Sequence, residues 1–413
     1  MSRAVLLALP LVAVRAGGAV AQGVATSWGA QAIPAFTQTN VVPGGGSLGE
    51  LRIVQPVAML QAGALGERLR FRATMNFEKW TILHGELAPG NWGEGFEDRR
   101  HPHTVAHELM LAARDLLGQL DGPVQLFLAA GKGFVPFGTD DPMSRPPVRF
   151  PVNHHLSQIP ERAVAIAGLM AGPVTLEGAL FNGDEPVGPD SWPAWDRFGD
   201  SWAARLTLTP VTGLETQASY AWVKSPENRP GNGLDDAKTN VSVRWERGRS
   251  YGLVEWARTS VSHGVFVYRS LLAEGALSRG RHRPYLRVEQ TERPEEERLF
   301  ENLFRTVRPL FENSILGVTR WTVLTVGDGF DALRSGPIRL TPFAEASYLR
   351  IAKVGGGVFD PAGFYGRERG FALSIGARLG GGMAMHRMGR YGPEPPARGG
   401  MMDMPMDHSS EER

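Results

Sequence analysis

The chain contains no cysteine among its 413 residues, which excludes disulfide bonds and thiolate chemistry. It also has no excess of either charge, because 44 lysine and arginine residues are balanced by 43 aspartate and glutamate residues. A balanced chain offers no general basic surface, so we expect no nucleic-acid partner. No segment fits a phosphate-binding loop, a dinucleotide fingerprint or a nucleophile elbow in its proper setting, and we expect no enzymatic activity.

Long apolar runs are also missing. Beyond the first two dozen residues, the longest stretch of apolar residues and glycine lies around Ala163–Ala171. That stretch is far shorter than the ~20 residues that a transmembrane helix needs. Any membrane-spanning part must therefore consist of strands. The 51 glycines and 30 prolines favour many turns over long helices.

Residues 1–21 have the three parts of a secretory signal peptide. Arg3 precedes an apolar segment over residues 4–14, and Ala19-Val20-Ala21 supplies small residues at a cleavage site. A buried N-terminal helix is the alternative, and export is the favoured interpretation. Residues 22–49 are rich in small and polar residues, and we expect them to form an irregular periplasmic lead-in.

Apolar and polar residues alternate repeatedly in the chain that follows. The alternation is almost free of error in Leu69–Glu78 and Ala237–Glu246. It recurs less strictly in Trp202–Thr209, Leu214–Trp222, Arg283–Gln290 and Phe371–Leu379. Since successive side chains of a strand point to opposite faces, each segment predicts a strand with one apolar and one polar face.

Such strands would suit either a soluble β-sandwich or a membrane barrel, and three features favour the barrel. The segments approach the roughly 9–11 residues of a tilted membrane strand. Their polar faces carry full charges, such as Arg72, Arg244 and Arg287, which a water-filled lumen tolerates. Aromatic residues lie near strand ends, where interfacial girdles would form: Phe77, Trp80, Tyr220, Trp222, Trp245 and Tyr251.

The connections support the same architecture. Some are very short, such as Thr212-Gly213, whereas residues 183–200 and 224–236 form long ones. Short periplasmic turns alternating with long outer loops are typical of outer-membrane barrels. The sequence therefore predicts an all-β protein of the bacterial outer membrane. Its residues 50–382 would form a transmembrane antiparallel up-and-down β-barrel of about 14 strands, with roughly 12 to 16 all compatible.

One short motif carries a family resemblance. Gly131-Lys132-Gly133-Phe134-Val135-Pro136-Phe137-Gly138 follows the predicted strand Val124–Ala130. It resembles the Gly-Lys-x-x-x-Pro-Phe-Gly element of the phosphate-selective porin O/P type and related porin-like barrels. The resemblance implies an outer-membrane channel for small solutes, sometimes anions, with Lys132 as a cation that faces the lumen.

The proline-rich stretch Pro136–Pro160 predicts a long loop, because proline cannot donate to a strand ladder. A loop folded into the barrel would narrow it, and rings of charge set selectivity in such constrictions. We hypothesise a pore constriction with a mild anion preference; a solvated loop on the periplasmic or outer side is the alternative. The pore and selectivity candidates are Lys132, Arg145, Arg149 and Arg162.

His103 and His107 are candidate metal ligands. Their spacing places both on one face of either a helix or a strand. Two imidazoles and a nearby carboxylate could hold a divalent metal, and a hydrogen-bonded cluster in the lumen or a turn is the alternative. Leu111 stands where a zinc protease would need its second histidine, so no hydrolase is predicted.

Residues 383–413 combine methionine and histidine with proline and glycine and show no apolar periodicity, which predicts a disordered tail. Thioethers suit Cu(I) and imidazole extends the set to Cu(II), so the tail is a candidate copper site. An accidental composition is the alternative. The candidate ligands in the tail are Met401, Met402, Met404, Met406 and His408.

Three functions follow from these patterns. The first is a porin-like channel for passive passage of small polar solutes or ions. The second is an outer-membrane barrel that captures copper or another soft metal through its tail, and the third is a plugged structural barrel. We expect no required cofactor. The expected partners are outer-membrane lipids and small polar solutes, and assembly into a homo-oligomer is compatible with the sequence.

Overall fold

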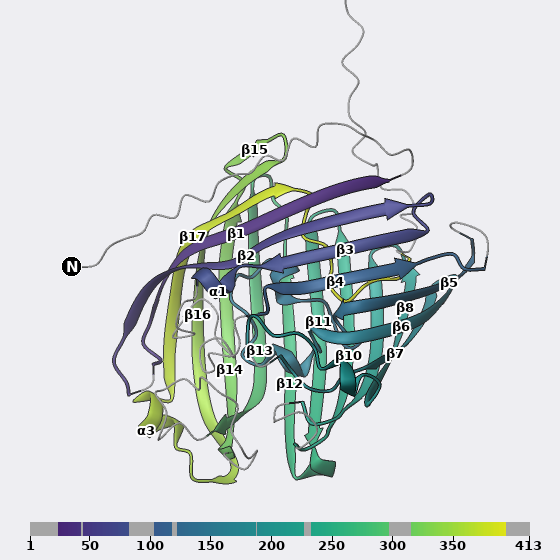
Figure 1. Ribbon diagram of the computed structural model, residues 1–413. Coiled ribbons are helices and arrows are strands. Elements are labelled where there is room, and N and C mark those ends of the chain that lie inside the picture. The colour runs from purple at the N-terminus through teal and green to yellow at the C-terminus, as the bar shows by residue number, and fades with distance from the viewer. Residues whose placement is uncertain are drawn as a thin grey trace, which may run out of the picture.

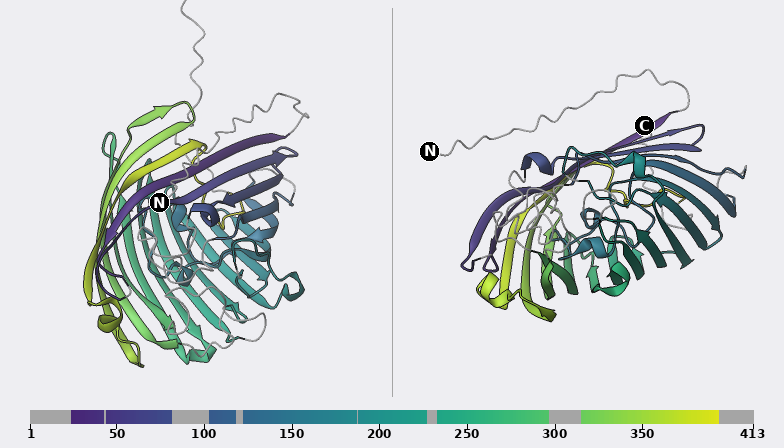
Figure 2. Two further views of the ribbon diagram at one scale, coloured as in Figure 1. Left: turned by 60° about the vertical axis from the view of Figure 1, so that its left-hand side comes forward. Right: turned by 60° about the horizontal axis from the view of Figure 1, so that its bottom comes forward.

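The chain forms one antiparallel sheet that closes on itself into a barrel (Figure 1). The structure, a computed structural model, describes residues 24–42, 44–81, 103–117, 122–186, 188–226, 233–296 and 315–393. Among these residues, no helix has both the length and the apolar character needed to cross a membrane. The two views of Figure 2 show the tilted wall strands and further segments of chain inside the ring.

The wall has 16 strands, because the short β15 (Leu333–Ser335) pairs only with β16. The predicted all-β antiparallel barrel is confirmed, and its strand number lies at the upper end of the predicted range. The wall strands are β1 (Ala25–Thr39), β2 (Leu48–Ala64), β3 (Leu69–Asn76), β4 (Ala106–Ala113), β5 (Val124–Gly133), β6 (Arg162–Ala171), β7 (Val174–Phe181), β8 (Ser201–Val211), β9 (Leu214–Val223), β10 (Asp236–Arg247), β11 (Ser250–Val261), β12 (Phe266–Ala276), β13 (His282–Glu296), β14 (Ile315–Phe330), β16 (Ile338–Gly357) and β17 (Arg369–Gly382). The helical elements within the described ranges are α1 (Glu78–Thr81), α3 (Pro361–Tyr365), η1 (Pro142–Ser144), η2 (His154–Leu156), η3 (Trp195–Arg197) and η4 (Ser262–Gly264).

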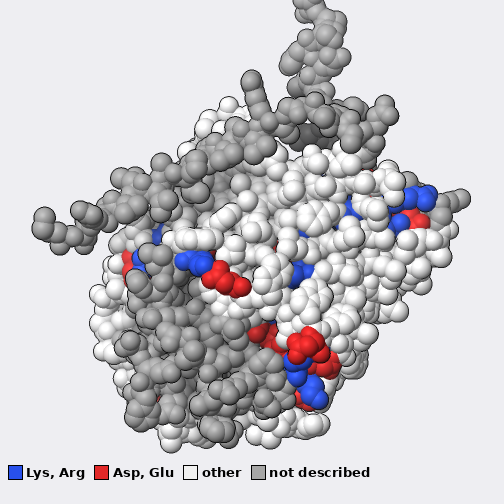
Figure 3. Space-filling model, viewed as in Figure 1, with Lys and Arg blue, Asp and Glu red and all other residues white. Residues whose placement is uncertain are grey.

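Strand β10 shows how the sequence pattern builds the wall. Its polar residues Asn240 and Ser242 are buried toward the lumen, whereas Val241, Val243 and Trp245 alternate with them and are 42–45% exposed. Over the described part of the face in Figure 3, charged side chains occupy a few spots and most of the visible surface is uncharged. An apolar outer face and a polar inner face are what a barrel in lipid requires.

The predicted aromatic positions divide between the two faces. Trp80, Tyr220 and Trp245 are between 38% and 49% exposed, as expected for aromatics at a lipid interface. Tyr251 does not belong to this group, because it is 5% exposed and its hydroxyl donates to Glu274 at 2.6 Å. The alternation of β11 places Tyr251 on the lumen side, together with Leu253. Its prediction as a girdle residue was wrong.

Short and long connections alternate along the ring, as the sequence predicts. The short turns include Gly172-Pro173 between β6 and β7 and Thr212-Gly213 between β8 and β9. Gly213 has φ 80°, and a Cβ there would lie 2.1 Å from the carbonyl oxygen of Glu246, so the turn requires glycine. The start of β1 and the end of β17 lie at the same side as these short turns, which is the periplasmic side in barrels of this kind.

The barrel closes where β1 pairs with both β2 and β17. The pairing of β1 with β17 runs from Gly29 opposite Gly382 to Thr39 opposite Ala372. The expected irregular lead-in over residues 22–49 is therefore wrong, because most of it is the closing strand. Small residues obscured its alternation, yet Ile33 and Ala35 are buried and pack in one cluster that includes Phe343.

Close packing at the closing strands generates a test of their role. A Cβ at Gly376 would lie 2.3 Å from the carbonyl oxygen of Pro34, so Gly376→Ala forces β17 away from β1. We expect a loss of about 1–3 kcal/mol in the free energy of unfolding. Gly178→Ala on β7 is the control, because a Cβ at Gly178 meets no atom within 4 Å. The temperature at which each variant loses its folded-form gel migration measures the stability of both variants. Equal stability of the two would contradict the tight closure.

Candidate functional site: the constricted lumen

Residues 134–161, which connect β5 to β6 and are called here the lumen loop, fold into the barrel. The loop is buried almost throughout, including the apolar residues Phe134, Phe137, Met143 and Phe150. Its many prolines explain the absence of strand pairing, as the sequence predicts. The alternative of a solvated loop does not agree with this burial.

The lumen loop reaches opposite sides of the ring. Near its two ends, the hydroxyls of Thr139 and Ser157 both donate to Glu255 on β11. In its middle, the backbone N–H of Val148 donates to Glu345 on β16 at 3.0 Å, and its carbonyl accepts from Gln55 on β2 at 3.0 Å. Since β2 and β11 lie far apart around the barrel, the loop must cross the lumen.

Two of the predicted selectivity residues, Arg145 and Arg149, hold this loop to the wall. Arg145 donates to the Thr139 hydroxyl at 2.7 Å and to the carbonyl oxygen of Asp140 at 2.6 Å. Its guanidinium also lies 3.6 Å from Glu274 on β12. Arg149 pairs with Glu289 on β13 at 3.1 Å. Both arginines are at most 3% exposed, so their charges interact with protein groups and not with solutes.

The other two candidates, Lys132 and Arg162, lie at the ends of β5 and β6. The Lys132 ammonium donates to the Thr104 hydroxyl at 2.5 Å and lies 5.4 Å from the ring centre of Trp192. Arg162 donates to two carbonyl oxygens and to Glu185 at 3.2 Å. The structure therefore brings all four predicted cations to the lumen loop and its ends, and each is engaged by protein acceptors.

A second segment, residues 383–393, also enters the lumen and is called here the C-terminal strap. Its expectation as part of a disordered tail was wrong. Met383 donates to the carbonyl oxygen of Trp28 on β1, and Arg205 on β8 donates to the carbonyl oxygen of Gly389 at 2.8 Å. Met388 is 1% exposed and packs in the cluster formed by apolar residues of the lumen loop. The strap thus crosses from β1 to β8.

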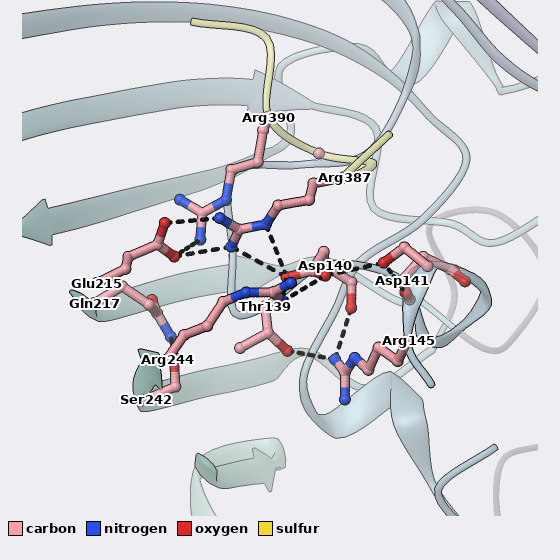
Figure 4. Close-up of polar contacts among 12 residues, drawn as sticks. Thr139, Asp140, Asp141, Arg145, Glu215, Gln217, Ser242, Arg244, Arg387 and Arg390 are labelled. Atoms are coloured by element: carbon pink, nitrogen blue, oxygen red, sulfur yellow. Dashed lines mark hydrogen bonds and ion pairs between the residues drawn. The ribbon is translucent and has the colours of Figure 1, made fainter. Parts of the chain in front are cut away.

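One buried carboxylate joins the wall, the lumen loop and the strap (Figure 4). Asp140 of the loop accepts from Arg244 on β10, with both oxygens at 2.8 Å, and from Arg387 of the strap at 3.1 and 3.2 Å. Arg387 also makes two bonds to Glu215 on β9, at 2.8 and 2.9 Å. Arg390 also donates to the Glu215 carboxylate, at 2.8 Å. Paired guanidinium and carboxylate groups of this geometry are strong and directional.

The ionisation of Asp140 follows from this arrangement. Burial opposes the charged form, but Arg244, Arg387 and Arg145 outweigh it and hold the pKa of Asp140 well below its usual range. Asp140 therefore stays anionic at neutral pH. The sequence pattern does not single out this aspartate, because nothing local distinguishes it from a solvated loop residue.

The structure also shows residues that sequence reasoning missed. Arg387 and Arg390 stand in a segment whose glycine, proline and methionine content predicted disorder, although the apolar residues Met388 and Tyr391 between and after them are buried. Glu215 and Arg244 follow the strand alternation, but their partner in the strap has no local signal. Only the pairing of distant segments reveals this cluster.

The predicted metal ligands divide into two groups. His103 and His107 are buried beside Glu161, the last residue of the lumen loop. The tail candidates Met401, Met402, Met404, Met406 and His408 lie outside the described residues. The copper interpretation of the tail therefore stays a prediction.

Comparison with solved structures gives the fold a context. The anion-selective porin from Comamonas acidovorans matches with a TM-score of 0.50 and 11% identity, over 86% of this chain and 99% of that chain. A loop L8 deletion mutant of OmpT, an outer membrane protein of Vibrio cholerae, matches with a TM-score of 0.47 and 11% identity over 87% and 99%. OmpF of Salmonella typhi, in complex with daunomycin, matches with 0.47 and 9% over 86% and 97%.

These comparisons show the fold. At 11% identity, the likeness to the Comamonas acidovorans protein means that this chain has the fold of an outer-membrane porin. No family model matches the sequence, and no curated protein matches it. The finer resemblance to the phosphate-selective O/P type stays a prediction.

Substitution of the shared carboxylate tests the cluster of Figure 4. Asp140→Asn leaves the buried Arg244 and the partly exposed Arg387 with less opposite charge, and we expect it to lower the free energy of unfolding by about 3 kcal/mol. Asp190→Asn is the matched control, because Asp190 pairs with Lys79 but is 71% exposed. The control should cost below about 1 kcal/mol. Urea unfolding in detergent measures both, and equal losses would exclude a special role for Asp140.

Proposed function

We propose that this protein is a passive outer-membrane channel for small polar solutes or ions. The observation that carries the proposal is a closed 16-strand barrel whose polar lumen is crossed, in the part of the chain that the structure describes, by the lumen loop and the strap. Barrels of 16 to 18 strands in this class leave room for an aqueous channel. The two crossing segments narrow that channel and would limit it to small solutes.

The exposed arginines of the strap support a mild anion preference. The side chains of Arg387 and Arg390 are 28% and 17% exposed, whereas Asp140, a partner of Arg387, is fully buried. Two acids beside them are also exposed: Glu215 at 16%, and Glu246, which pairs with Arg244, at 46%. The strap itself contributes two exposed cations to the lumen and no exposed acid among its described residues, and charges that line a constriction set ion selectivity. This assignment moves the filter from Lys132, Arg145, Arg149 and Arg162 to the strap.

Reversal potentials in a salt gradient test the channel and its filter together. We expect stable conductance steps in a planar bilayer, with a reversal potential on the side of anion preference. Arg387→Gln combined with Arg390→Gln removes both exposed cations and should shift the reversal potential toward cation preference.

The control for this experiment is Arg249→Gln. Arg249 lies in the turn after β10, is exposed and pairs with Asp331, which follows β14. It should leave the reversal potential unchanged. Cation preference in the unmodified protein would refute the anion filter. Absence of any conductance in folded protein would refute the channel and favour a plugged structural barrel.

Removal of the strap tests whether it narrows the lumen. A variant that ends at Gly382 lacks the crossing segment, so we expect larger conductance steps. A variant that ends at Pro393 lacks only residues 394–413 and is the matched control, because it keeps every described contact of the strap. Equal conductance of the two truncated proteins would show that the strap does not limit the path.

A further inference from the structure

Three buried side chains meet at the long-loop side of the barrel, close to the start of β4 and the start of β6. His103 lies just before β4, His107 lies in β4, and Glu161 ends the lumen loop. One donor atom from each of the three lies within 4.8 Å of the others. His103 is 9% exposed, Glu161 is 5% exposed and His107 is fully buried.

The geometry of this cluster is that of ligands around a shared point. Nδ1 of His107 lies 2.6 Å from Oε1 of Glu161, and Nδ1 of His103 lies 3.9 Å from the same oxygen. The two imidazole rings are 4.7 Å apart and nearly perpendicular. The ring of His154, in the lumen loop, is centred 6.1 Å from that of His103.

The carboxylate of Glu161 is held in place by its neighbours. Both the backbone N–H and the hydroxyl of Thr104 donate to Oε1 of Glu161 at 2.9 Å, and Lys132 donates to the same hydroxyl. Lys132 thus positions the carboxylate through Thr104. Such outer contacts are typical of built ligand sites, where they fix the orientation of the liganding groups.

Carboxylates surround this cluster. Asp141 of the lumen loop and Glu108 of β4 lie within electrostatic range of His107. The surroundings of His107 therefore favour a cation.

We propose that His103, His107 and Glu161 bind one divalent transition metal ion of the zinc or copper(II) type. Two imidazoles and one carboxylate suit such ions better than Mg²⁺ or Ca²⁺, which prefer oxygen ligands alone. Three protein ligands leave a fourth position, which His154 or water would occupy. The inference is independent of the proposed channel and of the methionine-rich tail.

The ion would connect two parts of the lumen that are distant in sequence. His107 belongs to the wall, whereas Glu161 closes the lumen loop immediately before β6. A bound metal would therefore fasten the end of the lumen loop to β4. We expect zinc to raise the thermal stability of the folded barrel, since a ligand that binds only the folded state stabilises it.

Zinc titration of the full-length refolded protein tests the site. Zn²⁺ is chosen as the probe because the thioethers of the tail prefer Cu(I). Isothermal titration calorimetry should show that His107→Gln and Glu161→Gln each lose one bound zinc per chain. The same two variants should also lose the rise in thermal stability that zinc gives to the unmodified protein.

His282→Asn is the matched control. His282 also has Nδ1 at 2.6 Å from a carboxylate, that of Asp328, but this pair is exposed and no third ligand joins it among the described residues. The control should keep the full zinc stoichiometry. Heat-modified gel migration identifies which variants are folded, and Glu161→Asp, which keeps the charge, should retain zinc more tightly than Glu161→Gln. Unchanged stoichiometry in folded His107→Gln and Glu161→Gln would overturn the proposal.

Discussion

The pairing of β1 with β17 is the constraint on which the rest of this structure depends. In a bilayer core no water can satisfy an open strand edge, so a sheet in lipid is stable only when it closes. Closure fixes which face of every strand is outside. Val241 and Val243 then meet lipid, and Asn240 and Ser242 on the same strand must face the lumen.

A closed polar lumen creates a second requirement, because its charges need partners. Four glutamates of the wall point inward, and the lumen loop forms hydrogen bonds or ion pairs with each of them: Glu255, Glu274, Glu289 and Glu345. The strap adds Arg387 where Asp140 and Glu215 would otherwise concentrate negative charge. Most charged side chains of the lumen are therefore paired with opposite charges of the protein. Ion selectivity then depends on the few charged side chains that remain partly exposed.

The alternation of residues predicted the wall well and its contents poorly, for a physical reason. Segments such as Leu69–Glu78 and Ala237–Glu246 match β3 and β10 because burial on one face leaves a local period of two. The closing strand Ala25–Thr39 was missed because alanine and threonine blur that period. The strap was missed because its arginines are stabilised by Glu215 and Asp140, whose approach depends on tertiary structure alone.

The histidine cluster shows how far local spacing reaches. The separation of His103 and His107 indicated a shared face, and the structure places both in one buried group. The third member, Glu161, lies 54 residues after His107, and only the return of the lumen loop to β6 brings it within 2.6 Å. The predicted selectivity residue Lys132 acts beside it through Thr104 instead of facing solutes. Residue type and spacing can therefore nominate side chains for chemistry, whereas the loop that crosses the lumen decides which of them meet.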